Sequence, residues 1–407
     1  MNRNVIKLIL MLLAVMLPTA WAFASQKVTI VVTGQGSIVA DKVQAMEGEL
    51  VTLTVSSDEG WKLKRRTLLV EQVTNTAGDS AQLTRGVVPT VGAFVTLSKQ
   101  SDNSYTFTMP NTDVEVRATF VEYVTSTTTI DAKIDNGESE TTTSVTINIT
   151  IETETGDVEI SQVTQPDNPY NSSLTITIPS VVTDSEGKEH PVTSIASGAF
   201  MGQTNVTDIF LPDTDDPLDI EEGALLLDNE TGDSHQVATI HTPLSLLDDY
   251  ALMSSLSENY MSGKICASAT AIHHYWTFSC GVDIKLPEGV KLYTVKRGTT
   301  KNVEILEIEN AVLIKANNGV LLACPDNGGN AYEMVVQPST ERPSGTKPAT
   351  DNAHSYPGNL MEPVIVGQHY DANAGYFILY NNEFYPITDE NQSKQIPACK
   401  AVLHLSK

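Results

Sequence analysis

The stretch Y-T-F-T-M-P-N-T-D-V-E-V-R-A-T-F, from Tyr105 to Phe120, decides the fold class. Apolar and polar residues alternate on both sides of Pro110, and a period of two places successive side chains on opposite faces of a strand. Proline ends the first strand because it has no N–H for the ladder, and residues 111–113 then form a turn. We expect two strands whose buried faces carry Tyr105, Phe107 and Met109 on one side of the turn and Val114, Val116 and Ala118 on the other.

The same alternation extends toward the N-terminus. It recurs in V-T-I-V-V-T-G-Q-G-S-I-V, residues 28–39, and in G-E-L-V-T-L-T-V, residues 48–55. Glycine tolerates the backbone of tight turns, so Gly34 and Gly36 predict a hairpin, and Glu59-Gly60-Trp61 predicts another with Trp61 in the core.

Together these motifs resemble the divergent internalin-type B repeat of bacterial surface proteins. The resemblance extends from about Lys27 to Glu122 and departs between Thr67 and Ser104, where a loop or an extra hairpin is expected. It implies a small β module, used as a spacer or a binding unit, without catalytic residues.

A second pattern follows a threonine-rich stretch, residues 125–151, which is either a set of strands or a flexible stalk. Ile195 and Ile220 are 25 residues apart, and so are Phe200 and Leu225. A spacing in the twenties is typical of a leucine-rich solenoid, in which each turn lays one short strand beside the previous one. The segments T-I-T-I-P, D-I-F-L-P and T-I-H-T-P, which end at Pro179, Pro212 and Pro243, are the expected strands.

The stretch from Val192 to Pro212 resembles the BspA-like leucine-rich repeats of bacterial surface antigens. The repeats are few and stop after Leu225, so a long concave binding surface is not expected. Leu244 to Met261 is the best candidate for a helix and would cap the solenoid.

The last third returns to short strands. Asn381-Asn382-Glu383 reads as the turn of a hairpin that pairs Tyr380 with Phe384, and a loop rich in Pro, Ser, Thr and Gly occupies residues 337–357. The order of strands from about Tyr275 to Lys407 resembles an uncharacterised all-β domain that often follows BspA-like repeats.

The N-terminus predicts export. Arg3 and Lys7 precede an apolar run, residues 8–17, which is too short to span a bilayer. Ala22-Phe23-Ala24 is a small-residue cleavage pattern, with cleavage after Ala24 preferred over Ala22. No cysteine follows either point, which argues against a lipid anchor, and no later stretch is long and apolar enough to predict a transmembrane segment. We therefore expect an exported protein at the cell surface or in the medium, with the periplasm as the alternative.

The charge is concentrated in the middle of the chain. Residues 123–264 contain 25 acidic and 3 basic residues, a net charge of −22. This field would repel nucleic acid and anionic lipid, and it favours solubility, basic partners or divalent cations. The acidic run from Asp213 to Glu222 offers oxygen ligands for calcium, but Pro217 and a missing glycine exclude an EF-hand loop, so a solvated turn is the preferred interpretation.

Candidate chemistry is sparse. The four cysteines are Cys266, Cys280, Cys324 and Cys399. They are candidates for one or two disulfides in an oxidising compartment, and the sequence does not choose among the three possible complete pairings. They lack the C-x₂-C spacing of zinc sites, and no hydrolase, metalloprotease, Walker or Rossmann signature occurs. The adjacent pair His273-His274 would place one imidazole in solvent and one in the core if it lay on a strand. We expect no catalytic residue, no cofactor and no metal.

The sequence thus predicts a mainly β, multi-domain protein with a small β-sheet repeat module, a short leucine-rich-repeat solenoid and a C-terminal β-sandwich-like domain. The boundaries are a signal peptide at 1–24, then 25–122, 123–264 and 265–407. The predicted function is adhesin-like, non-enzymatic binding of an extracellular protein or glycan. The alternatives are an extracellular hydrolase or its accessory binding subunit, recognisable by a cleft lined with paired carboxylates, and a structural surface or pilus subunit that self-associates through an open strand edge.

Overall fold

The computed structural model describes residues 25–73, 91–101, 103–135, 137, 139–164, 172–228, 235–299, 302–325, 329–339, 356–372 and 374–405. The predicted signal peptide at 1–24 lies outside these ranges. The described chain is mainly β, as predicted, and forms two compact units. The first contains the described residues up to Val124 together with Glu152–Glu154, and the second contains the remaining described residues.

The first unit contains two sheets around one apolar core. One sheet is built on the first part of β10 (Val114–Asp135), with β1 (Gln26–Thr33), β3 (Gln44–Ala45), β5 (Trp61–Leu63), β6 (Leu69–Val73) and β7 (Val91–Phe94). The other has the order β2 (Gly36–Ala40), β4 (Leu50–Ser57), β9 (Ser104–Thr108) and β8 (Ser98–Ser101). The predicted alternation is confirmed in this core, which buries Val51, Leu53, Phe107, Met109, Val114 and Val116.

The two predicted hairpins of this unit are wrong. The glycine turn at 34–36 carries the chain from β1 in one sheet to β2 in the other, and β1 pairs in parallel with β10, Val28 opposite Val114. Likewise, the turn at Gly60 leads from β4 to β5, which pairs with β10. Local turn residues therefore specified the reversals, while the strand partners came from residues far away in the sequence.

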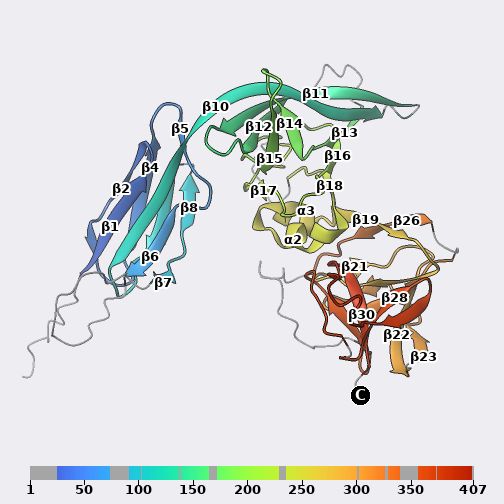
Figure 1. Ribbon diagram of the computed structural model, residues 1–407. Helices are drawn as coiled ribbons and strands as arrows, with labels where there is room; N and C mark the ends of the chain where they lie inside the picture. The colour runs from blue at the N-terminus through green and yellow to red at the C-terminus, as the bar shows by residue number, and fades with distance from the viewer. Residues whose placement is uncertain are drawn as a thin grey trace, which may run out of the picture. The chain divides into compact units, whose positions relative to one another are not determined.

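The second unit begins with strands that lie side by side in one hydrogen-bonded sheet, which we call the strand stack (Figure 1). They are β11 (Glu140–Glu152), β12 (Val158–Thr164), β13 (Ser173–Thr177), β14 (Val181–Thr183), β15 (Glu189–Ile195), β16 (Val206–Phe210), β17 (Asp219–Ile220), β18 (Thr239–Thr242) and β19 (Ile265–Ala271). The three proline-terminated segments do lie side by side, as β13, β16 and β18, in parallel. The threonine-rich stretch forms strands rather than a stalk over its described residues, in the second part of β10 and in β11.

The register of this stack explains the 25-residue spacing. Ile195 lies opposite Ile220, and Ile209 and Ile240 occupy the corresponding place in the next ladder, where each is fully buried. Each turn thus repeats one inward isoleucine, which is the packing that a solenoid requires. The assignment of these turns to BspA-like repeats stays a prediction.

The segment predicted as one helix, Leu244 to Met261, is interrupted. It forms two α-helical turns, α2 (Leu247–Leu252) and α3 (Ser257–Met261), each preceded by a 3₁₀ turn, η1 (Leu244–Leu246) and η2 (Ser254–Leu256). The break is at Met253, whose backbone is extended (φ −63°, ψ 127°). Each half still buries a leucine and a tyrosine, Leu247 with Tyr250 and Leu256 with Tyr260, so each helical turn keeps a buried apolar face although the helix is not continuous.

The chain then continues within the same unit, because β19 pairs with β18 on one side and with β26 (Asn330–Val335) on the other. One four-stranded sheet has the order β20 (Tyr275–Phe278), β25 (Val320–Ala323), β22 (Lys291–Gly298) and β23 (Val303–Glu307). Another has the order β27 (Met361–Val364), β30 (Lys400–His404), β28 (Tyr376–Tyr380) and β29 (Glu383–Pro386). A short pair joins β21 (Ile284–Lys285) to β24 (Leu313–Ile314).

These two four-stranded sheets pack against each other, as expected of a sandwich-like domain. Their shared core contains Val295, Met361, Phe377 and Leu403. Gly319 allows the close approach, because a Cβ there would lie 2.7 Å from the backbone carbon of Glu362.

The hairpin between β28 and β29 is confirmed, but its register is shifted by one residue from the prediction. Tyr380 pairs with Glu383, and Leu379 pairs with Phe384. The loop therefore contains two residues, Asn381 and Asn382, both at positive φ (47° and 64°). Asparagine tolerates this conformation, which is that of a type I′ turn, so the loop closes without using Glu383.

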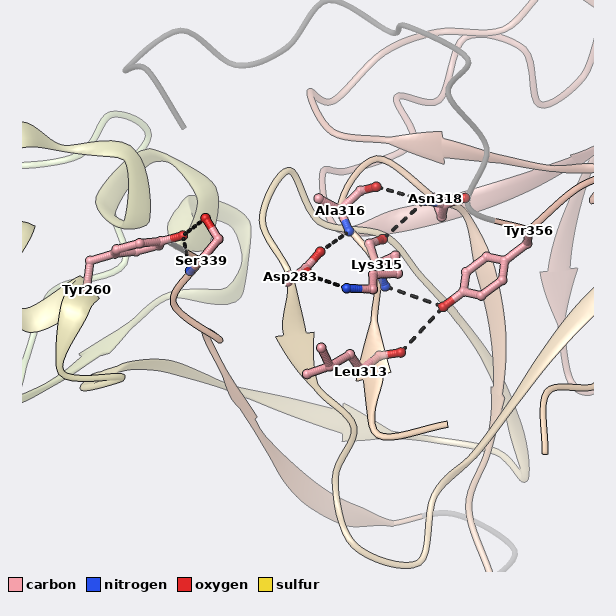
Figure 2. A network of polar contacts seen from close by, with 8 residues as sticks. All are labelled: Tyr260, Asp283, Leu313, Lys315, Ala316, Asn318, Ser339 and Tyr356. Carbon is pink, nitrogen blue, oxygen red and sulfur yellow. Dashed lines mark hydrogen bonds and ion pairs between the residues drawn. The ribbon is translucent and has the colours of Figure 1, made fainter. Parts of the chain in front are cut away.

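A polar network holds the short β21–β24 pair in place (Figure 2). Asp283 receives the Lys315 ammonium at 2.8 Å and the Ala316 N–H at 2.8 Å. The hydroxyl of Tyr356 donates to the carbonyl of Leu313 at 3.4 Å. These contacts satisfy polar groups at a place where the pair is too short to form an extended ladder.

Candidate functional site

A cavity is lined by residues of the two four-stranded sheets that form the sandwich. It has a volume of about 460 Å³, within the range of small-ligand sites. Its described lining comes from both sheets and comprises Tyr275, Thr299, Asn302, Val303, Ile305, Leu321, Phe377, Leu379, Asn382, Glu383, Phe384 and Leu403. We call this cavity the sandwich groove.

The sandwich groove has an apolar floor and a polar rim. Leu321, Phe377 and Leu403 form the buried floor. The exposed rim carries one hydroxyl, two amides and one carboxylate, from Thr299, Asn302, Asn382 and Glu383. Such a mixture suits a neutral ligand that presents an apolar face together with hydroxyl or amide groups.

Two edge strands form its walls. β23 and β29 each end the hydrogen-bonded order of a sheet, and both contribute side chains to the sandwich groove. The turn between β28 and β29 is anchored from the side, because Asn382 Oδ1 accepts the backbone N–H of Tyr275 at 2.8 Å. The rim is therefore held by a contact between residues that are far apart in the sequence.

Exposed aromatic side chains continue beside this rim. Tyr380 and Tyr385 are 67% and 42% exposed, and their rings meet edge to face with centroids 6.2 Å apart. Glu383 accepts the Tyr385 hydroxyl at 2.9 Å, and this carboxylate raises the pKa of the phenol. Exposed tyrosines of this kind are enriched at binding surfaces because they combine an apolar ring with a polar tip.

The described lining of the sandwich groove contains a single carboxylate, Glu383. A glycoside hydrolase requires two carboxyl groups facing the bond that it cleaves. The arrangement that we had expected for the hydrolase alternative is therefore not found among the described residues of this groove.

The acidic run lines a second, shallower depression. Asp213, Asp215 and Asp216 lie there with Asp249, and residues 366–367, 395 and 397–398 also line this volume of about 910 Å³. These three of the six carboxylates of the run are exposed, as expected of a solvated turn. Calcium binding by this run stays a prediction.

The predicted disulfide residues are all buried, and no disulfide joins any two of them. Cys280 and Cys399 interact with each other through their side chains, and Cys280 also donates to Asp248 Oδ1 at 2.7 Å. Burial raises the pKa of the Cys280 thiol, and the neighbouring thiol adds to this effect. Cys324 lies apart from this pair, with its sulfur 3.4 Å from the carbonyl oxygen of His274.

The prediction for the adjacent histidines is wrong. His273 and His274 lie in a bend before β20, and both are half-buried. The alternation rule applies only to extended strands, so neither imidazole is fully exposed or fully packed. His274 meets the ring of Tyr275 edge to face, with centroids 4.5 Å apart.

A cluster that we had not predicted lies on the strand stack. His241, Cys266 and Glu333 form the one group of three or more potential metal ligands found among the described residues, with donor atoms within 4.8 Å of one another. A signal for it was present in the sequence, because His241 and Cys266 are separated by 25 residues, the same spacing as Ile195 and Ile220. Residues one period apart become neighbours in a stack of parallel strands.

Comparison with known families supports part of the predicted resemblance. Residues 90–123 match the family model of the divergent InlB B-repeat domain. The match covers the closing motif, where the sequence pattern was strongest. This domain is typical of surface proteins, so a surface or adhesin-like role fits in general. No curated protein and no solved structure matches the chain.

No helix in the described part of the chain has the length and apolar character needed to cross a membrane.

Proposed function

We propose that this protein is an exported, non-enzymatic binding protein that acts at the cell surface or in the medium. Three features support this proposal: the B-repeat match at residues 90–123, the signal-like N-terminal sequence, and the sandwich groove. The groove is the observation that carries it, because it supplies a concave site with recognition chemistry.

The composition of the groove supports recognition rather than turnover. Its rim offers hydroxyl and amide groups, and Tyr275 and Phe384 offer aromatic rings at its walls. Sugars and peptide backbones both satisfy such a rim, since each combines apolar patches with neutral hydrogen-bonding groups. The proposed ligand is therefore a neutral stretch of an extracellular glycan or protein.

The test is a pair of arrays, one of glycans and one of extracellular matrix proteins, probed with the labelled protein. The critical variant is Phe384→Ala, which removes a ring from the groove wall. Its matched control is Tyr385→Ala, because Tyr385 follows Phe384 on β29 and is not part of the groove lining.

Binding of the wild type that falls at least tenfold in Phe384→Ala, and is retained in Tyr385→Ala, supports the groove as the site. Loss of binding in the control alone would instead place recognition on the exposed tyrosines. Thermal melts of both variants establish that the fold is retained. Cleavage of a bound glycan or protein during the incubation would overturn the non-enzymatic proposal, and sedimentation of the unliganded protein as long oligomers would favour the structural subunit.

A further inference from the structure

The outer face of the strand stack brings together a histidine, a cysteine and a glutamate from three neighbouring strands. His241 on β18 lies opposite Cys266 on β19, and Cys266 lies opposite Val335 on β26. Glu333 is two residues from Val335, so it projects from the same face. The sheet register therefore fixes the three side chains next to one another.

The distances among their donor atoms are those of a small coordination sphere. His241 Nδ1 is 3.3 Å from Cys266 Sγ, and Cys266 Sγ is 3.4 Å from Glu333 Oε1. Tetrahedral Zn²⁺, with bonds of about 2.1 Å to nitrogen or oxygen and about 2.3 Å to sulfur, places such donors about 3.5 Å apart. The observed spacing fits this geometry with little movement of the side chains.

The imidazole is prepared for this role by a carboxylate on the next strand. Asp208 Oδ1 lies 2.7 Å from His241 Nε2. A neutral His241 that donates Nε2–H to Asp208 presents the lone pair of Nδ1 toward Cys266. Carboxylates orient metal-binding histidines in this way, and their loss weakens metal binding.

Phe210 fixes the plane of the same ring. Its ring stacks on the imidazole of His241 with centroids 4.1 Å apart and an angle of 6° between the planes. Asp208 thus holds the edge of the His241 ring through Nε2, and Phe210 holds its face. A preorganised ring of this kind reduces the side-chain entropy that ligand binding would otherwise remove.

The cluster contains more lone pairs than protons. When His241 donates Nε2–H to Asp208, the three facing atoms, Nδ1, Sγ and the carboxylate oxygen, share only the thiol proton of Cys266. Burial and the adjacent Glu333 carboxylate raise the pKa of this thiol far above its ordinary value. Within the described residues, no ion pair joins Glu333 to a lysine or arginine. A cation placed among the three atoms would relieve this crowding.

The same residues do not form an activated nucleophile. A cysteine nucleophile is commonly activated by a neighbouring histidine that a carboxylate orients, and it requires a thiol pKa below the ordinary value. The Cys266 thiol has the opposite shift and is 1% exposed. Metal binding by the same three residues does not require that the Cys266 thiol be ionised beforehand, because the cation displaces the thiol proton when it binds.

We propose that His241, Cys266 and Glu333 bind a divalent transition-metal ion, with Zn²⁺ the best match for a thiolate, an imidazole and a carboxylate. Asp208 acts as a positioning residue for His241. On binding, the metal forms a bond to sulfur, and the thiol proton passes to solvent. Glu333 is exposed, so a fourth position faces water. The ion would tie β26 to β18 and β19.

The test uses the untagged protein freed of metal by a chelator and titrated with Co²⁺, then with Zn²⁺. Thiolate ligation gives a sulfur-to-cobalt charge-transfer band that other ligands do not produce. We expect this band to saturate at one equivalent of Co²⁺, to disappear when Zn²⁺ is added, and to be accompanied by release of one proton per ion in calorimetry with buffers of different ionisation enthalpy.

The variants assign the ligands. Cys266→Ser abolishes the charge-transfer band, while Cys324→Ser, which changes another buried cysteine, retains it. Glu333→Gln changes an exposed residue, and it should weaken Zn²⁺ binding at least tenfold. Asp208→Asn should weaken it by about 10- to 100-fold without removing the band. No charge-transfer band in the wild type, or an equal loss in Cys324→Ser, would overturn the proposal.

Discussion

Gly36 lies against the ring of Phe120, so closely that a Cβ on Gly36 would be 2.5 Å from two of its ring carbons. Gly34, two residues earlier, is closer still to the backbone of Phe120, because a Cβ there would be 2.1 Å from the carbonyl oxygen. The chain therefore crosses between the two sheets of the first unit at a point where a side chain at either glycine would clash with Phe120.

We expect Gly36→Ala to destabilise the first unit by about 1–3 kcal/mol, because the added methyl group overpacks the core beside Phe120. Chemical denaturation followed by circular dichroism measures this change. Gly48→Ala is the control: Gly48 has a positive φ of 85° but open space around its Cα, so it reports backbone strain alone. If the double variant Gly36→Ala with Phe120→Leu is no more stable than Gly36→Ala, overpacking is not the cause.

Asp248 is buried at the start of α2 and should be a stability determinant of the second unit. Its Oδ1 accepts the backbone N–H of Gly281 at 2.7 Å as well as the thiol of Cys280. Asp248→Ala leaves a buried N–H without its acceptor, which we expect to cost about 1–3 kcal/mol in unfolding free energy. Asp249→Ala, at the neighbouring half-buried position, is the control and should cost less than about 1 kcal/mol. Equal losses in the two variants would contradict this assignment.

Oxidation should join Cys280 to Cys399. Cys280 and Cys399 interact through their side chains, and one of the three complete pairings that the sequence left open contains this pair. Cys324 follows β25 at the end that pairs with Tyr275, whereas Cys280 follows β20 beyond its opposite end. With a small disulfide such as oxidised glutathione as the oxidant, two thiols become one disulfide, and the oxidant is reduced to two thiols.

Peptide mapping of the oxidised protein under non-reducing conditions measures this link. We expect a Cys280–Cys399 cross-linked peptide and an increase in unfolding free energy of about 3–5 kcal/mol, because the bond closes a loop of more than a hundred residues. Cys399→Ser removes both effects, while Cys324→Ser retains them. A cross-link between any other two cysteines would show that the native contact does not direct oxidation.

The turn at Asp184 should make stability depend on acid pH. Hydrogen bonds from the backbone N–H of Lys188 and from the ring of the buried His190 lower the pKa of the Asp184 carboxyl below its ordinary value of 3.8. The pKa of the Asp184 carboxyl is therefore lower in the folded protein than in the unfolded chain. The stabilisation by this carboxylate is complete at pH values above its unfolded pKa, and it is lost as the pH falls through its folded pKa.

Thermal melts of the wild type and Asp184→Asn from pH 7 down to pH 2 measure this effect. We expect a constant difference in Tm above about pH 5, shrinking as the pH falls below about 4. Glu186→Gln removes a charge from the same exposed turn without touching these hydrogen bonds, and it controls for general charge effects. A difference in Tm for Asp184→Asn that does not change with pH would contradict the linkage.

The success of the sequence predictions depended on whether a pattern was local. Alternation around Pro110 gave the right buried face for Phe107 and Val114, and the family model matches the same region. The hairpin predicted at Gly34 was wrong, because glycine specifies a reversal but not the partner of the next strand. The Asn-Asn turn was found but placed one residue out, since the choice between loop lengths depends on φ at each asparagine.

The candidate sites depended almost entirely on contacts between distant residues. Tyr275 and Asn382 are more than a hundred positions apart, and nothing in either segment predicts that they form the rim of one groove. The exception is His241 with Cys266, whose 25-residue separation equals the spacing of Ile195 and Ile220. A search for polar residues that follow the same period would have placed them side by side.

The sequence by itself determined that these segments are strands, which residues face inward, and the period with which the stack repeats. These properties follow from side-chain size, polarity and turn chemistry, which act over a few residues. Only the tertiary structure decided that β1 pairs with β10 and that Glu333 meets Cys266. Strand pairing is made by backbone N–H and C=O groups that are alike in almost every residue, so the partner is selected by packing of the whole core.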